Sequence, residues 1–224
     1  GVQTCALPIY LLLETVRARP GEVTLVTLGP LTTVALALER EPALPRLLRR
    51  WVLMGGAFGV PGNTTPVAEW NVHCDPEAAR LAFGGWARAI EADPSLPRAL
   101  ALGLDVTEQV RFLPGHLEAL LAAAGPGPIG RFVADALAFY FDFHERYDGF
   151  RGAFVHDPLA VAAALDPGLV RTEPVFADVE TTGELTSGMT VPDRRGHLGR
   201  RPNLDLAVAV DGAAFLGRLA ERLA

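Results

Sequence analysis

The sequence predicts an α/β fold: a mostly parallel sheet with helices on both faces. Short apolar runs, such as residues 23–28 and 51–54, alternate with longer segments whose apolar residues recur at helical spacing. The run at 23–28 is rich in β-branched and aliphatic residues, which is typical of a buried parallel strand. Gly-Pro and Asp-Pro pairs separate the segments and mark turns and helix starts. Strands that alternate with helices in this way indicate a parallel sheet.

In chain order, the first expected element is a helix over residues 10–18, which Pro20-Gly21 stops. Strands are expected at 23–28, 51–54 and 99–104. Further helices are expected at 31–40, 76–83, 114–123, 129–146, after Asp157-Pro158, and at 213–223. Because parallel α/β sheets bind ligands at the carboxyl ends of their strands, a site is expected in the loops after Leu28, after Met54 and before Asp157.

Length and composition limit the function classes. The chain has 224 residues, 50% of them hydrophobic, which is enough for one core, and residues 10–224 are expected to form one domain. Its net charge of −6 argues against nucleic-acid binding, which needs a basic surface. No apolar run is long enough to cross a bilayer. The two cysteines, Cys5 and Cys74, do not suggest a disulfide framework, so a reducing cytoplasm is expected.

Two blocks of sequence carry the strongest motifs. Residues 24–38 read TLVTLGPLTTVALAL and residues 51–79 read WVLMGGAFGVPGNTTPVAEWNVHCDPEAA. Together they resemble the central region of the inosine–uridine-preferring nucleoside hydrolase family. The matching motifs are Gly29-Pro30-Leu31-Thr32, Met54-Gly55-Gly56, Gly62-Asn63, Glu69-Trp70-Asn71, residues 75–79, residues 104–107, residues 156–160 and residues 188–193. Thr33 and Trp70 depart from the family's usual Asn and Phe.

The resemblance implies an enzyme that hydrolyses the N-glycosidic bond of ribonucleosides to ribose and free base with a calcium-activated water. It implies that Asn63 and Glu69 bind the 5′ side of the ribose, that Asn71 binds the vicinal diol and that Met54 packs beneath the sugar. It assigns calcium ligation to the Asp157 carboxylate and the Leu28 carbonyl. The expected partner is a small ribonucleoside, and family members are commonly homodimers or homotetramers.

The residue types also suit this chemistry by themselves. An oxocarbenium-like ribosyl centre needs groups that hold the sugar hydroxyls, and Asn63, Glu69 and Asn71 supply amides and a carboxylate. In extended backbone, Glu69 and Asn71 would share a face. The alternative is that all three are exposed turn formers. His156 is the catalytic candidate for protonating the leaving base, with His73 second, and the other three histidines are expected at the surface.

Asp157 has a competing structural interpretation. Asp followed by Pro commonly caps a helix, and Asp75-Pro76 and Asp166-Pro167 repeat the same pattern. Calcium takes roughly 6–8 oxygen ligands, so one carboxylate cannot hold it alone. The family's amino-terminal D-x-D-P-G-x-D-D segment, which supplies most of the calcium carboxylates and the general base, is absent from this sequence. The chain is therefore expected to be an inactive fragment with an incomplete calcium site.

The first nine residues are expected to be an artefact. Residues 1–9 read GVQTCALPI, which resembles a common short-read sequencing adapter translated in one frame. Two other functions are compatible with parts of the sequence. A non-catalytic ribose-binding or assembly module would keep the same fold. A dinucleotide-binding oxidoreductase is disfavoured because Gly29-Pro30-Leu31-Thr32 lacks the G-x-G-x-x-G spacing.

Overall fold

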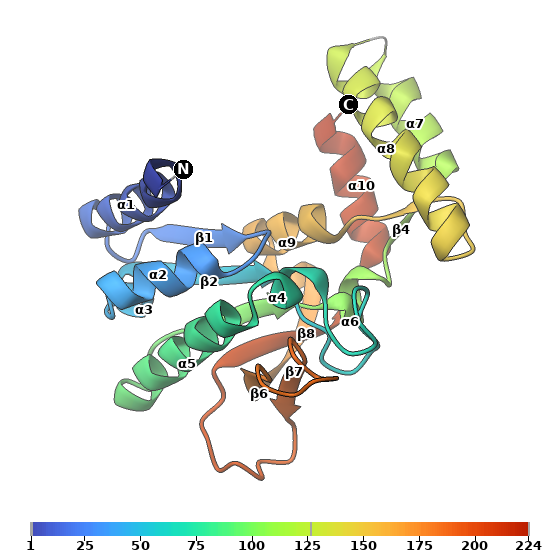
Figure 1. The fold of residues 1–224 in the computed structure, drawn as a ribbon. Helices are drawn as coiled ribbons and strands as arrows, with labels where there is room; N and C mark the ends of the chain where they lie inside the picture. The colour runs from blue at the N-terminus through green and yellow to red at the C-terminus, as the bar shows by residue number, and fades with distance from the viewer. Residues whose placement is uncertain (1, 126, 224) are drawn as a thin grey trace. The chain divides into compact units, whose positions relative to one another are not determined.

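The computed structural model describes residues 2–125 and 127–223 and divides them into two compact units (Figure 1). The first unit comprises residues up to 105 together with 171–209, and the second comprises residues 106–170 with 210 onward. Cys5 lies outside the residues whose side chains are described, and Cys74 is a free, exposed cysteine. No helix in these described ranges is long and apolar enough to span a membrane.

The first unit is built on a six-stranded sheet with the order β1-β2-β3-β8-β6-β7. Pairing is parallel from β1 to β8, whereas β6 and β7 pair antiparallel. The strands are β1 (Val23–Thr27), β2 (Leu48–Met54), β3 (Ala99–Leu102), β6 (Val170–Val179), β7 (Thr190–Asp193) and β8 (Leu204–Val210). The expected α/β class with a mostly parallel sheet is confirmed.

Five described helices belong to this unit: α1 (Val2–Ala18), α2 (Thr32–Arg40), α3 (Leu44–Leu47), α4 (Trp70–Cys74) and α5 (Pro76–Ala92). The short helix α6 (Leu104–Thr107) begins in this unit and ends in the second. The α2 helix packs against both α1 and α5. Asp75 caps α5 by accepting a hydrogen bond from Ala78 N (3.0 Å), with Pro76 at the first helical position, as the sequence predicts.

The core of the first unit is centred where α5 packs on β2. Trp51 from β2 contacts Trp86 from α5 with ring centroids 4.9 Å apart, and Phe83 meets Trp51 edge-on at 6.4 Å. All three rings are fully buried. In contrast, all five residues of β1, which forms one edge of the sheet, are only half-buried. The sheet is therefore anchored through its centre rather than through this edge.

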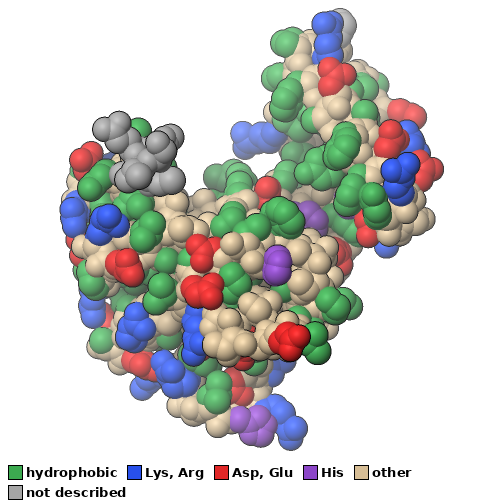
Figure 2. All heavy atoms as spheres, viewed as in Figure 1, with side chains coloured by type: hydrophobic (Ala, Val, Ile, Leu, Met, Phe, Trp, Pro, Cys, Tyr) green, Lys and Arg blue, Asp and Glu red, His purple; other side chains and the backbone are tan. Residues whose placement is uncertain are grey.

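The second unit is mainly helical. Its elements are β4 (Arg111–Phe112), α7 (Pro114–Ala124), α8 (Pro128–Tyr147), β5 (Ala153–Phe154), α9 (His156–Leu165), the 3₁₀ helix η1 (Pro167–Leu169) and α10 (Gly212–Leu223). The strands β4 and β5 form a two-stranded antiparallel sheet. Large apolar side chains of α8 are exposed, and Figure 2 shows hydrophobic side chains over this part of the surface. They are Ile129, Phe132, Phe139, Tyr140, Phe143 and Tyr147.

Most expected elements form, although the bounds of several differ. The helix expected over 76–83 extends to residue 92, and the strand expected over 51–54 begins at residue 48. The short helices α3, α4 and α6 were not expected. They lie in segments without a full helical repeat, where capping and tertiary contacts rather than periodicity determine the backbone.

Candidate functional site

The loop that follows β2 is fixed by side chains from distant segments. Three consecutive backbone N–H groups, at residues 56–58, each donate to a different side chain. Glu69 accepts from the first (2.9 Å), Thr190 from the second (3.0 Å) and Asp105 from the third (2.9 Å). Thr190 also donates to the carbonyl of Ala57 (2.8 Å). Because buried backbone groups rarely lack partners in native structures, these bonds specify one loop conformation.

Two glycines make this loop possible. Gly56 has a φ of +89°, and a Cβ placed there would lie 2.7 Å from the Phe58 ring. At Gly62, a Cβ would collide with backbone atoms of Thr65 and Ala68. Glycine is the residue that allows the backbone to turn and approach this closely. The Gly-rich composition of the loop therefore has a steric cause.

The loop ends in α4, whose first turn is completely capped. The backbone N–H groups of residues 70–72 have no partner inside the helix. Asn63 Oδ1 accepts from the first of them (3.0 Å), and Glu69 accepts from the second through Oε1 (2.8 Å) and from the third through Oε2 (3.2 Å). Glu69 is only 2% exposed, so its carboxylate connects the Gly-rich loop to the start of α4.

Asn71 lies in the first turn of α4 and is turned toward β2. Its Nδ2 group donates to the Met54 carbonyl (3.1 Å) and lies 3.4 Å from the Met54 sulfur. Both residues are buried. Among the described residues, no hydrogen bond reaches the Asn71 Oδ1 atom. The strand end therefore fixes the amide orientation and leaves one acceptor for another partner.

Two expectations about this segment are wrong. Glu69 and Asn71 do not lie in continuous extended backbone, because Glu69 is the N-cap of α4 and Asn71 is helical. The exposed-turn alternative is also wrong for these two residues, which are buried, although Asn63 is exposed. The residues still gather around the carboxyl end of β2. The remaining expected residue of the first unit, Leu28, directly follows β1 and has an exposed side chain.

His156 begins α9 in the second unit. Its Nδ1 atom lies 2.7 Å from Thr107 Oγ1, which fixes the orientation of the ring. Burial lowers the pKa of His156 to about 4, the nearby His144 acts in the same direction, and Asp148 opposes both. The imidazole is therefore uncharged at pH 7, which differs from the expectation of a proton donor poised near neutrality.

Asp157 differs from the other two Asp-Pro aspartates. Asp75 caps α5, and Asp166 caps η1 by accepting from Gly168 N (3.0 Å). Asp157 instead lies inside the first turn of α9, whose N-cap is Val155, so the helix-cap interpretation is wrong for it. The carboxylate of Asp157 is half-buried and has no hydrogen-bond or ion-pair partner among the described residues, and burial raises its pKa.

The other histidines separate into exposed and buried. His73, His116 and His197 are exposed, the last two as expected. The surface expectation is wrong for His144, which is 6% exposed. Its Nδ1 atom lies 2.6 Å from Asp148 Oδ2, one helical turn along α8. The His144 ring is buried because Phe150 and Phe154 pack against it.

The fit to a calcium ion is partial. Asp157 suits one ligand position, because an unpaired carboxylate oxygen is the donor type that calcium prefers. Within the residues that the structure describes, however, no group of three or more His, Cys, Asp or Glu side chains could hold a metal ion. The described residues therefore supply one candidate carboxylate rather than a coordination sphere.

The sequence did not predict the roles of three residues that support the site. Asp105 and Thr190 hold the Gly-rich loop, and Thr107 holds His156. The signal was present in the motifs at 104–107 and 188–193, which match the family in sequence but carry no obvious ligand chemistry. Their side chains act on backbone groups or on another side chain, and contacts of that kind cannot be inferred from spacing.

Comparisons with known proteins agree on one family. The model of the inosine-uridine preferring nucleoside hydrolase family matches residues 4–217. The pyrimidine-specific ribonucleoside hydrolase RihA of Citrobacter koseri is 40% identical over 99% of this chain and 67% of its own length. Among solved structures, a plant nucleoside hydrolase superposes with a TM-score of 0.84 at 31% identity, covering 95% of this chain and 65% of that one.

A purine-preferring ribonucleoside hydrolase from Gardnerella vaginalis gives a TM-score of 0.85 at 30% identity, covering 96% of this chain and 64% of that protein. The chain thus spans about two thirds of the length of these relatives. The ordered motifs and the mostly parallel sheet agree with the family match, which covers most of the chain. The chain belongs to the inosine-uridine preferring nucleoside hydrolase family.

Proposed function

We propose that this chain forms the sugar-binding part of an enzyme that hydrolyses the N-glycosidic bond of ribonucleosides. The observation that carries this proposal is the fixed Asn71 amide. Met54 and α4 hold it in one orientation, while its Oδ1 atom lacks a partner among the described residues. A preorganised acceptor of this kind suits a ribose hydroxyl, because its orientation is set before the substrate arrives.

Asn63 and Glu69 would support the sugar in different ways. Asn63 uses its Oδ1 atom to cap α4, and no hydrogen bond from its Nδ2 group to a described residue is present, so this group is a candidate donor to the 5′ hydroxyl. Glu69 accepts bonds from three backbone N–H groups. Its principal contribution would be to keep the Gly-rich loop and Asn71 in place, with any sugar contact secondary.

In the second unit, His156 and Asp157 are the candidate catalytic and calcium-binding residues. Because His156 is uncharged at pH 7, a role in protonating the leaving base requires that the complete site raise its pKa. Asp157 would ligate calcium, since its carboxylate is half-buried and unpaired. A bound calcium ion would supply Lewis acidity. The other ligands would have to come from outside the side chains described, with the Leu28 carbonyl as one candidate. The 224-residue chain alone is therefore proposed to be inactive.

The experiment compares this chain with a full-length enzyme that contains it behind the D-x-D-P-G-x-D-D segment. Uridine, cytidine and inosine are the substrates, because relatives are named for both pyrimidine and purine specificity. Release of free base is measured with calcium and with a chelator. The full-length enzyme is expected to hydrolyse at least one substrate in a calcium-dependent manner, and the 224-residue chain none.

An Asn71→Ala variant of the full-length enzyme tests the proposed role of the Asn71 amide. We expect kcat/KM to fall by about 100-fold, since a preorganised hydrogen bond to the reacting sugar is lost. Thr64→Ala is the control, because Thr64 is exposed in the same loop and its hydroxyl makes just one long hydrogen bond among the described residues, to Asn63 Oδ1 (3.4 Å). Equal activity of both variants would remove Asn71 from the site. A full-length enzyme inactive on all three substrates would favour a non-catalytic ribose-binding module.

A further inference from the structure

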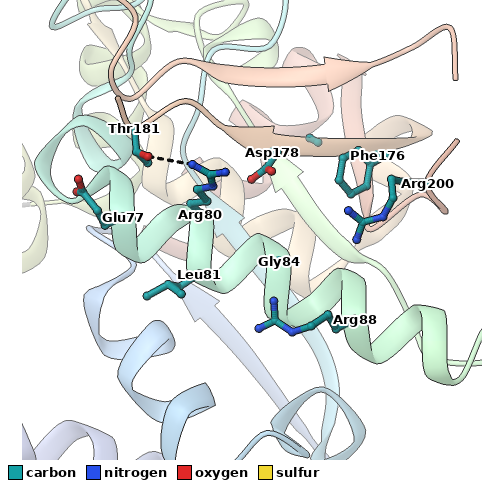
Figure 3. A pocket seen from close by; sticks show the side chains of 10 residues that line it. Glu77, Arg80, Leu81, Gly84, Arg88, Phe176, Asp178, Thr181 and Arg200 are labelled. Atoms are coloured by element: carbon teal, nitrogen blue, oxygen red, sulfur yellow. Dashed lines mark hydrogen bonds between the residues drawn. The ribbon is translucent and has the colours of Figure 1, made fainter. Parts of the chain in front are cut away.

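The first unit contains a cavity that none of the proposed hydrolase residues lines. It has a volume of about 440 Å³ and lies between α5 and the end of β6 (Figure 3). One wall is a single face of α5, and the opposite wall includes Phe176, Asp178 and Thr181. Arg200, from the segment before β8, closes one side. The cavity is therefore built from elements of one compact unit.

Three arginines line this cavity. Figure 3 shows Arg80 reaching from α5 toward Thr181, and its Nη1 group donates to the Thr181 hydroxyl (3.1 Å). Neither Arg80 nor Arg88 forms an ion pair with a carboxylate among the described residues. Arg200 is held by Glu91 through Nε (2.6 Å) and lies 4.7 Å above the Phe176 ring. Among the described residues, no hydrogen bond from its Nη groups is present, so each of the three guanidinium groups lining the cavity keeps N–H donors for a ligand.

A glycine keeps the α5 wall open. Gly84 is four residues from both Arg80 and Arg88, so all three lie on the same helix face. A Cβ at Gly84 would lie 3.3 Å from Arg88 Nη1. Glycine inside a helix is less favourable than alanine. Here it leaves room for the Arg88 guanidinium to lie back along the helix.

The cavity wall also carries two carboxylates, which limit the classes of ligand that can bind there. Asp178 and Glu77 line the same space. Asp178 Oδ1 accepts from the Val179 backbone (2.8 Å), and no bond to Oδ2 is present among the described residues. Carboxylates repel a bare anion but accept hydrogen bonds from hydroxyl groups. The ligand that fits is therefore an anion with hydroxyl groups beside it.

We propose that this cavity binds a small phosphate monoester that carries hydroxyl groups. The guanidinium groups of Arg80, Arg88 and Arg200 would bind the phosphate oxygens, which match their planar donor geometry. Asp178 would accept a hydroxyl. This site is separate from the proposed ribose site, and its test does not depend on hydrolysis.

The test uses isothermal titration of the 224-residue chain with glycerol 2-phosphate at constant ionic strength. Saturable binding is expected, together with a rise in the midpoint of thermal unfolding. Arg80→Ala and Arg88→Ala should each raise Kd by about tenfold, as expected when a charge-assisted hydrogen bond is removed. Arg40→Ala is the matched control, because Arg40 is also exposed on a helix of the same unit but does not line the cavity. Circular dichroism checks that each variant is folded.

A second variant blocks the cavity without changing its charge. Gly84→Leu should abolish binding, because the side chain would occupy the space beside Arg88. Absence of saturable binding by the parent chain, or unchanged Kd values for Arg80→Ala and Arg88→Ala, would overturn the proposal. Inorganic phosphate that binds as tightly as glycerol 2-phosphate would overturn the requirement for hydroxyl groups.

Discussion

The helices α4 and α9 each begin beside an acidic side chain, but only the carboxylate at α4 has hydrogen-bond partners among the described residues. Glu69, at the start of α4, is almost fully buried, and its carboxylate accepts three backbone hydrogen bonds. Asp157, at the start of α9, is half-buried and has no partner among the described residues. The first arrangement is self-sufficient and contributes to folding. The second opposes folding unless something else binds, which is the usual property of a residue kept for a ligand.

The histidine beside Asp157 strengthens this contrast. His156 is buried enough that its pKa falls to about 4, and the main cause is desolvation. Desolvated His156 and Asp157 are adjacent at the same helix terminus, whereas the Glu69 carboxylate at the start of α4 finds its partners inside the first unit. Three measurements test whether the two helix starts differ in this way.

The largest expected effect concerns pH and His156. The unfolded chain takes up a proton near pH 6.5 and the folded chain only near pH 4, so the unfolded state binds more protons between these values. Stability should therefore fall as the pH drops from 6.5 to 4. A difference of about 2.5 pKa units corresponds to about 3 kcal/mol of unfolding free energy. Urea unfolding at several pH values measures this slope.

A His156→Gln variant isolates this contribution from that of the carboxylates. The variant lacks a titrating imidazole, so the gap between its unfolding free energy and that of the parent should change across this pH window. His73→Gln is the control, because His73 is an exposed histidine of the first unit. Parallel curves for the parent and His156→Gln would show that the ring is not desolvated, and the contrast between the two helix starts would weaken.

The second expected effect is on Glu69. A Glu69→Gln substitution keeps the size of the side chain but replaces one acceptor oxygen with an NH₂ group that faces a backbone N–H. We expect a loss of about 2 kcal/mol in unfolding free energy, the usual cost of leaving a buried donor unsatisfied. Urea unfolding at pH 7 measures it.

Glu180→Gln is the matched control for Glu69. The Glu180 Oε1 atom also accepts three hydrogen bonds, from Thr182 N, Thr182 Oγ1 and Gly183 N, but in an exposed loop. Water can replace these bonds, so its loss should be much smaller. Equal losses for the two variants would mean that burial does not distinguish the Glu69 cap.

The sequence predicted the architecture better than the side-chain roles. The apolar runs at 23–28 and 51–54 became β1 and part of β2 because buried strands are encoded by local composition. The residues around the β2 loop were also identified, since the motifs are contiguous. The helical backbone at 69–71 was not predicted, because a five-residue helix depends on its caps rather than on periodicity. The burial of His144 was missed because it arises from aromatic residues that the turn after α8 brings back.

The three Asp-Pro pairs show the same limit more sharply. Asp75, Asp157 and Asp166 share a dipeptide, and local sequence assigns the same capping role to each. Two are caps and one is not. The helix of Asp157 begins one residue earlier, at His156, whose ring is held by Thr107 about fifty residues away in sequence. The dipeptide alone therefore does not predict the role of the aspartate.

The smallest expected effect, and the only one that should stabilise the chain, is at Asp157. Burial raises its folded-state pKa above the ordinary value, so ionisation costs stability as the pH rises through that folded pKa. Asp157→Asn removes this cost, and we expect a small gain in unfolding free energy at pH 7, because solvent screens half of the carboxylate. Asp166→Asn is the matched control and should not stabilise, because Asp166 caps η1 and pairs with Arg218. A destabilised Asp157→Asn variant at pH 7 would mean that the carboxylate has a structural partner after all, and the distinction between the two helix starts would be lost.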